Sequence, residues 1–220
     1  MSTDFAEDRI VAEAQQVVRD LRGRVTRLDD NGLDLLFRCA RSHNGWQDRP
    51  VSDAQLHELY EIVRCGPTAN NGQPARITFL RSSEAKARLA PALAPGNVAK
   101  AEKAPVVAII GFDTSFYENF DTLFPHKPEY KTKFADNTAL AETVAFRNGS
   151  LQGAYFILAA RALGLDAGPM SGFDNAKADA AFFAGTSVKS NFVCAIGYGD
   201  ETAIFGRLPR LEFDQACTIL

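Results

Sequence analysis

The chain has 220 residues, of which 46% are hydrophobic and 23% charged, and its formal net charge is −3 at pH 7. This composition is typical of a soluble globular protein with one sizeable core, and the scattered Lys and Arg residues give no basic face, so we expect no nucleic-acid partner. The N-terminus lacks the pattern of a secretory signal and no apolar run reaches membrane-spanning length, so we expect a cytoplasmic protein without a membrane partner.

The first predicted element is a helix over residues 4–22, where apolar residues recur with a helical period and the opposite face is charged. We interpret residues 1–30 as an N-terminal helical extension that packs on the body or on a partner. Residues 31–220 would then form the main domain.

Two more helices are predicted before the first strand. One covers residues 31–40, and its inward-facing side chains are Leu33, Leu36 and Phe37. The next begins after Ser52 or Asp53, both good N-cap residues, and continues to Gly66.

The middle of the chain alternates strands and helices. A short strand is predicted over 77–80, a helix over 83–93 with two prolines beyond it, and a buried strand over 105–112. Residues 113–137 are aromatic and irregular, which suggests a lid or excursion. A long helix follows over 138–163, and one of its sides carries Leu140, Val144, Leu151, Tyr155, Leu158 and Ala162.

The last part of the chain contains a turn at 168–173, a helix at 175–183, a buried strand at 191–198 and a final segment, 207–220, that is extended at first. The helices are long and the strands few. The sequence therefore predicts an α+β fold around a small sheet.

Cysteines and histidines are too dispersed to predict a metal site. The four cysteines show no CxxC spacing and are best interpreted as reduced thiols of a cytoplasmic protein. They are Cys39, Cys65, Cys194 and Cys217, and the histidines are His43, His57 and His126.

Three short motifs fail as known ligand or catalytic signatures. Residues 197–200 lack the third glycine and the helix of a dinucleotide fingerprint. Residues 185–190 lack the glycine before the lysine of a phosphate loop, and residues 168–172 place serine one position too late for a nucleophile elbow.

Three polar clusters remain as candidates for ligand binding. Residues 41–44 combine a cation, a hydroxyl and two nitrogen-bearing side chains, a set that can bind a phosphate or the polar edge of a flavin. The alternative is a solvated helix C-terminus, and the local residue types favour it. Residues 66–76 form a loop rich in amides and hydroxyls, and residues 169–173 place a serine between glycines, or simply turn into the next helix.

Taken together with Arg207-Leu208-Pro209, the three clusters have the order and spacing of the FMN-dependent nitroreductase family, which the chain resembles from about Leu33 onward. The matching segments are ARSHNGW, PTANNGQP, ALGLDAGPMSGF and RLP. More narrowly, RSHNGW, GPMSGFD, KSNFVCAIGYGD and RLPRL resemble the malonic semialdehyde reductase subgroup of bacterial pyrimidine degradation, which makes 3-hydroxypropionate.

The resemblance implies a nitroreductase-like fold with a small mixed or antiparallel sheet flanked by helices. It also implies an obligate homodimer with two FMN sites at the subunit interface, each lined by both chains. The long helix that begins at Thr138 would then be dimer core rather than monomer core.

The same resemblance implies the cofactor-binding residues. Arg41 and Ser42 hold the FMN phosphate or ribityl chain, and His43 and Asn44 lie toward the ring. Pro67, Thr68 and Asn71 reach the partner's flavin, Met170, Ser171 and Gly172 form the turn whose backbone N–H faces flavin N5, and Arg207 binds phosphate. Because Ala40, Asn44 and Phe205 stand where many members have cations, Lys100 or Lys103 is expected to compensate near the ring.

The implied activity is ping-pong. NADH or NADPH reduces FMN through N5, and a second substrate, malonic semialdehyde, then accepts the hydride. No protein side chain is assigned as catalyst or proton donor. Two alternatives stay open: a broad-specificity NAD(P)H nitro or quinone reductase of the same fold, and a flavin-binding protein without turnover.

Overall fold

The computed structural model describes residues 2–220, and the side chains from Arg9 on. Contacts along the chain divide it into two compact units, Met1–Ala40 and Arg41–Leu220. The first unit contains α1 (Ser2–Arg24), α2 (Asp30–Leu33) and a π-helical turn, η1 (Asp34–Arg38). The helix predicted over residues 4–22 is confirmed.

The predicted helix over 31–40 is only partly regular. Asp29 caps α2 by accepting a hydrogen bond from the Gly32 N–H at 2.7 Å, and after one turn the Cys39 N–H bonds to the Asp34 carbonyl oxygen at 3.0 Å. This i→i+5 bond widens the helix and changes its period. Phe37, which the regular period placed inward, is 53% exposed, so that part of the prediction is wrong.

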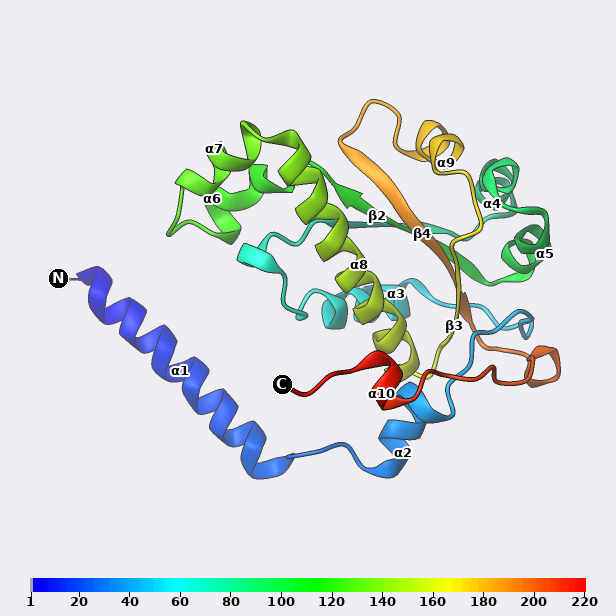
Figure 1. The fold of residues 1–220 in the computed structure, drawn as a ribbon, viewed down its shortest axis with the longest axis horizontal. Coiled ribbons are helices and arrows are strands. Elements are labelled where there is room, and N and C mark those ends of the chain that lie inside the picture. Colours follow the sequence, from blue (N-terminus) through cyan, green and yellow to red (C-terminus); the bar gives the residue numbers. More distant parts are fainter. Residues whose placement is uncertain (1) are drawn as a thin grey trace. The chain divides into compact units, whose positions relative to one another are not determined.

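The second unit is built on one antiparallel sheet of four strands in the order β1-β2-β4-β3 (Figure 1). The strands are β1 (Ala75–Leu80), β2 (Val106–Asp113), β3 (Asp166–Met170) and β4 (Val188–Gly197). All three pairings are antiparallel, with one bulge between Ile110 and Gly111. The predicted α+β fold around a small sheet is confirmed.

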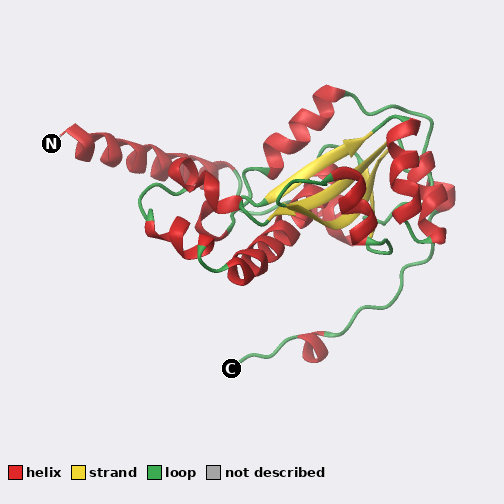
Figure 2. Cartoon of the chain, turned by 90° about the horizontal axis from the view of Figure 1, so that it is seen from above, coloured by secondary structure: helices red, strands yellow, loops and turns green. Residues whose placement is uncertain are grey.

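Helices cover both faces of the sheet (Figure 2). Side chains of the fully buried β2 alternate between two cores, so that Val106, Ala108 and Ile110 face one side while Val107 and Ile109 face the other. The first face is covered by α3 (Asp53–Val63) and α8 (Thr138–Ala162). The second is covered by α4 (Ser83–Leu89), α5 (Pro95–Lys103) and α9 (Asn175–Phe182).

The helix α3 begins where the sequence predicted. Ser52 and Gln55 form a capping box in which the Gln55 N–H donates to Ser52 Oγ and the Ser52 N–H donates to Gln55 Oε1. Two short 3-10 turns, η2 (Ala69–Asn71) and η3 (Ala90–Ala92), follow along the chain. The helix predicted over 83–93 is therefore α4 followed by η3.

The long helix α8 packs on the sheet through its small residues. Its buried positions include Ala141, Ala145, Gly149 and Gly153, whereas Leu151, which the sequence placed on the apolar side, is exposed. A Cβ at Gly149 would lie 2.8 Å from Phe112 Cβ, so glycine permits the close approach. The predicted helix is confirmed, but its most buried face is the small-residue face.

The segment 113–137 is not irregular. It contains η4 (Phe116–Asn119), α6 (Phe120–Leu123) and α7 (Glu129–Ala135). Phe116, Phe120 and Phe134 are buried together beside the start of α8, and the Phe116 and Phe134 rings lie 5.2 Å apart. The aromatic residues that suggested a lid form a third core, which corrects that interpretation.

Two of the elements that the sequence analysis did not predict, α5 and β3, each contain a proline. Pro95 stands at the first turn of α5, where its missing N–H costs nothing, and Pro169 lies in the edge strand β3. The turn predicted at 168–173 therefore begins inside a strand.

The C-terminal segment follows β4 through a 3-10 turn, η5 (Glu201–Ala203), and a single helical turn, α10 (Phe213–Ala216). Apart from that turn, residues 204–220 belong to no helix or strand, and they expose Phe205, Leu208, Leu211 and Phe213. Among the described residues there is no helix of sufficient length and hydropathy to span a membrane.

Candidate functional site

A pocket of about 240 Å³ lies at the β3 edge of the sheet, where three distant segments meet. One segment precedes α3, the second belongs to α5, and the third is the end of β3 with the turn that follows it. The lining residues are Ser42, His43, Asn44, Asn97, Lys100, Gly168, Pro169, Met170, Ser171, Gly172 and Ala195. The structure thus brings together two of the three polar clusters identified from the sequence, and Lys100.

The segment 42–44 is fixed to the outer edge of β3 by its backbone. The His43 N–H donates to the Ala167 carbonyl oxygen at 3.1 Å, and Ser42 forms a parallel bridge with Ala167. A Cβ at Gly168 would lie 2.4 Å from the His43 carbonyl oxygen. Glycine at position 168 therefore allows this wall of the pocket to approach the strand.

The His43 imidazole is held from two sides. Its Nε2 lies 3.1 Å from Asp166 Oδ1, and the other oxygen of Asp166 accepts the Gly199 N–H at 2.8 Å. A Cβ at Gly199 would lie 1.9 Å from His43 Nδ1, so the ring packs directly on this glycine. Within the described residues, the buried His43 Nδ1 and Trp46 Nε1 have no hydrogen-bond partner.

Asp200 adds a stable negative charge near this histidine. The hydroxyl and the backbone N–H of Thr202 both donate to its Oδ1, and with His43 nearby these bonds hold the pKa of the Asp200 carboxyl below its usual value. The loop after β4 therefore places the ionised Asp200 carboxylate close to the His43 side chain.

The turn after β3 is held by α5. The Gly172 carbonyl oxygen accepts the Ala94 N–H at 2.9 Å and Asn97 Nδ2 at 3.0 Å, and the Asp174 N–H donates to the Ala92 carbonyl oxygen. Within the described residues the N–H groups of Ser171 and Gly172 donate to no acceptor. They remain available to a ligand in the pocket that they line.

Asn97 is a site residue that sequence reasoning missed. The available signal was Pro95, which marks the first turn of a helix and would have placed Asn97 and Lys100 three positions apart on one face. Lys103, the other expected cation, belongs to the same helix but does not line the pocket.

The loop 66–74 lies elsewhere, between α3 and β1. Pro67, Thr68 and Asn71 do not line the 240 Å³ pocket. The Thr68 hydroxyl accepts the Gln73 N–H at 3.1 Å, and Asn71 Nδ2 donates to the Leu123 carbonyl oxygen at 3.0 Å. Within one chain, the structure therefore does not bring these residues to the other predicted site residues.

The loop 66–74 has an unusual backbone. Asn70, Asn71 and Gln73 have φ values of 54°, 48° and 41°, and in the described part of the chain no other residue except glycine has a positive φ. Such conformations are uncommon outside glycine and concentrate at functional sites. Arg76 braces the loop by donating to the Gln73 carbonyl oxygen and pairing with Asp113 at 2.6 Å.

The two predicted phosphate-binding arginines do not line the pocket. Arg41 Nη2 donates to the Phe205 carbonyl oxygen at 2.5 Å, which connects the 41–44 segment with the C-terminal segment. Arg207 lies two positions further along that exposed segment. Among the described residues, no three or more His, Cys, Asp or Glu side chains are grouped so that they could hold a metal ion.

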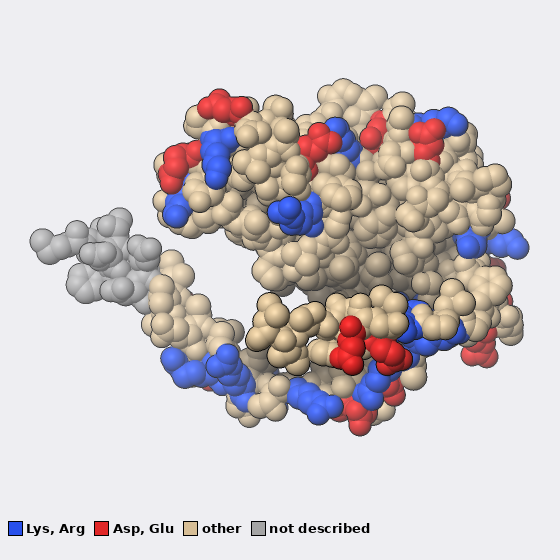
Figure 3. Space-filling view, viewed as in Figure 1, with Lys and Arg blue, Asp and Glu red and all other residues tan. Residues whose placement is uncertain are grey.

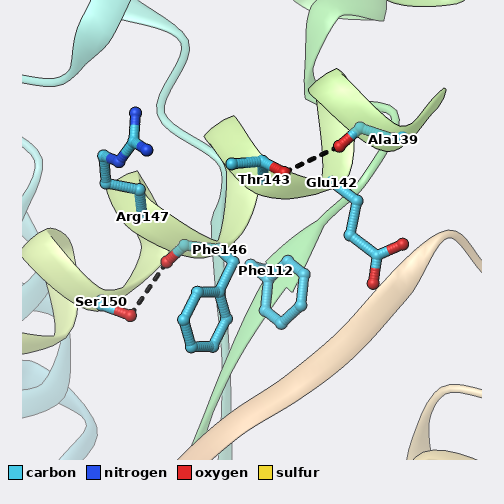
Figure 4. A pocket seen from close by; sticks show the side chains of 7 residues that line it. All are labelled: Phe112, Ala139, Glu142, Thr143, Phe146, Arg147 and Ser150. Atoms are coloured by element: carbon cyan, nitrogen blue, oxygen red, sulfur yellow. Dashed lines mark hydrogen bonds between the residues drawn. The ribbon is translucent and has the colours of Figure 1, made fainter. Parts of the chain in front are cut away.

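Two larger hollows lie away from this pocket. One, of about 670 Å³, is lined by Phe112 and by the outer side of α8 (Figure 4). The other, of about 540 Å³, lies between α3 and the edge strand β1 and includes Leu56, His57, Tyr60 and Phe79.

Comparison with known proteins places these features in a family. Residues 39–200 match the model of the nitroreductase family. A Burkholderia lata protein provisionally named NADH dehydrogenase/NAD(P)H nitroreductase is 58% identical over 195 residues, which cover 89% of this chain and all of that protein. A Ralstonia pickettii protein, HadB, with the same provisional name is 59% identical over 85% of this chain and 96% of its own length.

Solved structures share the fold at low identity. A nitroreductase-like protein of Exiguobacterium sibiricum, solved in complex with FMN, has a TM-score of 0.76 and 18% identity over 89% of this chain and all of its own. A Bacillus subtilis protein, ydfN, has a TM-score of 0.75 and 21% identity over 82% of this chain and 95% of its own.

Proposed function

The chain belongs to the nitroreductase family, and on this basis we propose that it is an FMN-dependent NAD(P)H oxidoreductase. The observation that carries the proposal is the pocket at the β3 edge. It combines the Ser42 hydroxyl, the Lys100 cation and the free N–H groups of Ser171 and Gly172. Donors and a cation around one small cavity suit an electron-rich, negatively charged ligand.

The size of the pocket supports a shared site. Ligand pockets commonly measure roughly 300–1,000 Å³, whereas this pocket measures about 240 Å³. FMN would therefore need a further wall. We propose that Pro67, Thr68 and Asn71 of a second copy supply it, which agrees with their position away from the pocket of their own chain.

Each remaining residue has a proposed role. Arg41, Ser42 and Arg207 would hold the phosphate and ribityl end, and Lys100 would favour negative charge that develops on the ring. The Ser171 and Gly172 amides would orient the ring, with Met170 beside them, while His43 and Asn44 would line its polar edge. When bound, FMN would supply hydride transfer through N5, taking hydride from NADH or NADPH and passing it to a second substrate.

The proposed second substrate is malonic semialdehyde, reduced to 3-hydroxypropionate. The support is the likeness of RSHNGW, GPMSGFD, KSNFVCAIGYGD and RLPRL to that reductase subgroup, together with Lys100, whose ammonium can hold a substrate carboxylate. A broad nitro or quinone reductase is the second candidate, and the provisional nitroreductase names of relatives at 58% and 59% identity favour it.

An absorption spectrum followed by steady-state kinetics tests the function. We expect flavin bands in the purified protein and bleaching by NADH or NADPH. Turnover of malonic semialdehyde should then exceed that of a nitroaromatic and of a quinone. Fast nitro reduction with negligible aldehyde turnover would support the second candidate instead, and a yellow protein that neither nucleotide reduces would indicate flavin binding without turnover.

A matched pair of variants on α5 tests the substrate assignment. Lys100→Met should raise the KM for malonic semialdehyde at least about tenfold, because a charge-assisted hydrogen bond is worth roughly 1.5–3 kcal/mol, and should leave the KM for an uncharged quinone nearly unchanged. Lys103→Met, which removes a cation outside the pocket, serves as the control. Equal effects on both substrates would argue against a carboxylate contact.

The exposed side of α8 supports the proposed homodimer. Phe146 is 51% exposed and meets Phe112 edge to face at 5.5 Å, while Arg147 points away from both rings (Figure 4). The hollow on this side of α8 is lined by Phe112 and Phe146 together with the charged Glu142 and Arg147, and Figure 3 shows charged and uncharged side chains side by side over this part of the surface. A face of this kind suits a second copy of the chain.

We also propose that residues 1–30 are an extension to the catalytic domain. The family match begins at residue 39, and the Burkholderia lata protein is covered completely by 195 residues of this chain. A chain that starts at Asn31 should retain FMN with unchanged affinity, measured by flavin fluorescence. Loss of the flavin would assign these residues to the domain itself.

A further inference from the structure

We propose that Asn148 and Gln152 of α8 are positioning residues that set the backbone of the loop 66–74. Through that backbone they would set Thr68 and Asn71, the residues proposed above to reach a partner's flavin. The part that concerns flavin rests on the proposed function, whereas the part that concerns the loop stands on the contacts of this chain.

Both side chains are polar groups placed inside the protein. Asn148 is 5% exposed and Gln152 4% exposed, and only Asp113 and Ser190 share this property among the polar and charged residues described. Their spacing of four residues puts them on the same face of the helix. Burying an amide without hydrogen bonds is costly, so the partners of these two groups identify their role.

Their partners are backbone amides of the loop. Asn148 Oδ1 accepts the Ala69 N–H at 2.8 Å, and its Nδ2 donates to the Val144 carbonyl oxygen on α8 at 2.8 Å. Gln152 Oε1 accepts the Ala75 N–H at 2.9 Å, at the first residue of β1. One turn further along the helix, the Tyr155 hydroxyl donates to the Pro67 carbonyl oxygen at 3.0 Å.

These hydrogen bonds lie on both sides of the part of the loop whose backbone conformation is energetically least favourable. Asn70, Asn71 and Gln73, with their positive φ values, all lie between Ala69 and Ala75. A stretch of this kind persists only when its surroundings restrain it. The two amides supply that restraint from a rigid helix, because each accepts a hydrogen bond at one end of the stretch.

The loop is also attached by close packing at its start. A Cβ at Gly66 would lie 2.1 Å from the Tyr155 ring, so the chain enters the loop in direct contact with α8. The Thr68 hydroxyl then accepts the Gln73 N–H, and Gln73 Nε2 donates to Asn71 Oδ1. A displacement of the loop at Ala69 or at Ala75 would therefore also move Thr68 and Asn71, the two residues proposed to contact the ligand.

The alternative is that Asn148 and Gln152 only fill the core between α8 and the sheet, and a set of variants separates the two roles. Gln152→Met keeps the volume and removes the acceptor for the Ala75 N–H. Gln152→Glu keeps an acceptor at the same place. Ser190→Ala is the matched control, since Ser190 is equally buried and bonds to Asn175 rather than to the loop.

The full chain is measured in two ways. Hydrogen exchange measures the protection of the backbone N–H groups of residues 66–76, except the two prolines. Fluorescence quenching measures FMN affinity, and visible circular dichroism reports the environment of the bound flavin. Gln152→Met should speed exchange of the Ala75 amide and weaken FMN affinity about fivefold, the factor that a typical net hydrogen bond of about 1 kcal/mol corresponds to. Asn148→Leu should do the same at Ala69. Gln152→Glu should stay within about threefold, and Ser190→Ala should lower the melting temperature without changing FMN affinity or its spectrum.

Each other outcome has a definite meaning. Unchanged exchange in both Gln152→Met and Asn148→Leu overturns the inference. Faster exchange with unchanged FMN affinity and spectrum overturns its flavin part and leaves loop support. If the unsubstituted protein takes up no FMN, the proposed function fails, and the exchange data still decide whether the two amides hold the loop.

Discussion

At the scale of single residues, the pocket depends on glycines that let backbone and rings come close. Gly168 accommodates the His43 carbonyl oxygen and Gly199 accommodates the His43 ring. Neither role is visible in the sequence, because both depend on contacts between residues far apart in the chain. The residue types of the 41–44 and 169–173 clusters were informative, but their meeting at β3 was not predictable from local patterns.

Arg41→Ala should weaken FMN binding roughly tenfold to a hundredfold, the range of a charge-assisted hydrogen bond. The reason is the proposed phosphate contact, and isothermal titration measures it. Arg41 also donates to the Phe205 carbonyl oxygen, so a structural effect needs a control. Riboflavin lacks the phosphate, and its affinity should not change. Equal losses for FMN and riboflavin would assign Arg41 to holding the C-terminal segment.

The cysteines differ in reactivity because only one is buried. Burial raises the pKa of the Cys194 thiol to about 12, whereas Cys39, Cys65 and Cys217 are exposed. Iodoacetamide at pH 8 should therefore modify the three exposed thiols of the folded protein and leave Cys194 unmodified, as read by mass spectrometry. Modification of Cys194 without denaturant would contradict its burial.

The same shift gives a dependence of stability on pH. Above pH 9 the unfolded chain loses the Cys194 proton and the folded chain keeps it until about pH 12, so the free energy of unfolding falls as pH rises through this window. The slope is at most about 1.4 kcal/mol per pH unit. Urea unfolding from pH 8 to 11 should show a steeper loss for the wild type than for Cys194→Ala, and parallel curves would exclude the effect.

At the scale of elements, α8 shows why the helix was predictable and its buried face was not. Periodicity located its bounds to within one residue, but most of its buried positions are alanines, glycines or the polar Asn148 and Gln152, which carry a weak apolar signal. Two of its larger apolar side chains, Phe146 and Leu151, are exposed, whereas Phe156 is buried. The sequence did not predict β3 and α5, because proline usually indicates the end of a strand or helix. Both elements nevertheless tolerate their proline, since one lies in an edge strand and the other in the first turn of a helix.

Gly149→Ala tests the close packing of this helix. Alanine should favour the helix by about 1 kcal/mol, but its Cβ would lie 2.8 Å from Phe112 Cβ, an atom that no side-chain rotation can move away. We expect a net loss of about 1–3 kcal/mol in the free energy of unfolding, measured in urea. Gly23→Ala in α1, where no heavy atom lies within 4 Å of the new Cβ, should cause no loss. A stabilised Gly149→Ala would contradict the packing.

At the scale of the whole molecule, the sequence correctly predicted an α+β fold with a small sheet because buried strands and amphipathic helices are strong local signals. Assembly is different, since it depends on surfaces. The exposed Phe146, Leu151, Leu208 and Phe213 are consistent with the proposed dimer, and the hollow over α8 gives a second copy a concave surface.

Sedimentation should therefore give about twice the 24.0 kDa mass of one chain. Leu151→Glu would place a charge on the exposed side of α8 and should shift the protein toward monomer, with loss of FMN because the proposed site needs both chains. Ala180→Glu, on α9 across the sheet, is the control. A monomeric wild type that still binds FMN would contradict the shared site.

The attachment of the 42–44 segment to β3 also affects the tendency of the protein to aggregate through its sheet edge. A sheet edge with free N–H and C=O groups can template pairing with strands of other molecules. Along β3, the Ala167 carbonyl oxygen already accepts the His43 N–H, Ser42 lies in a parallel bridge beside Ala167, and Pro169 offers no N–H. The contacts that build the pocket therefore also protect this edge from aggregation.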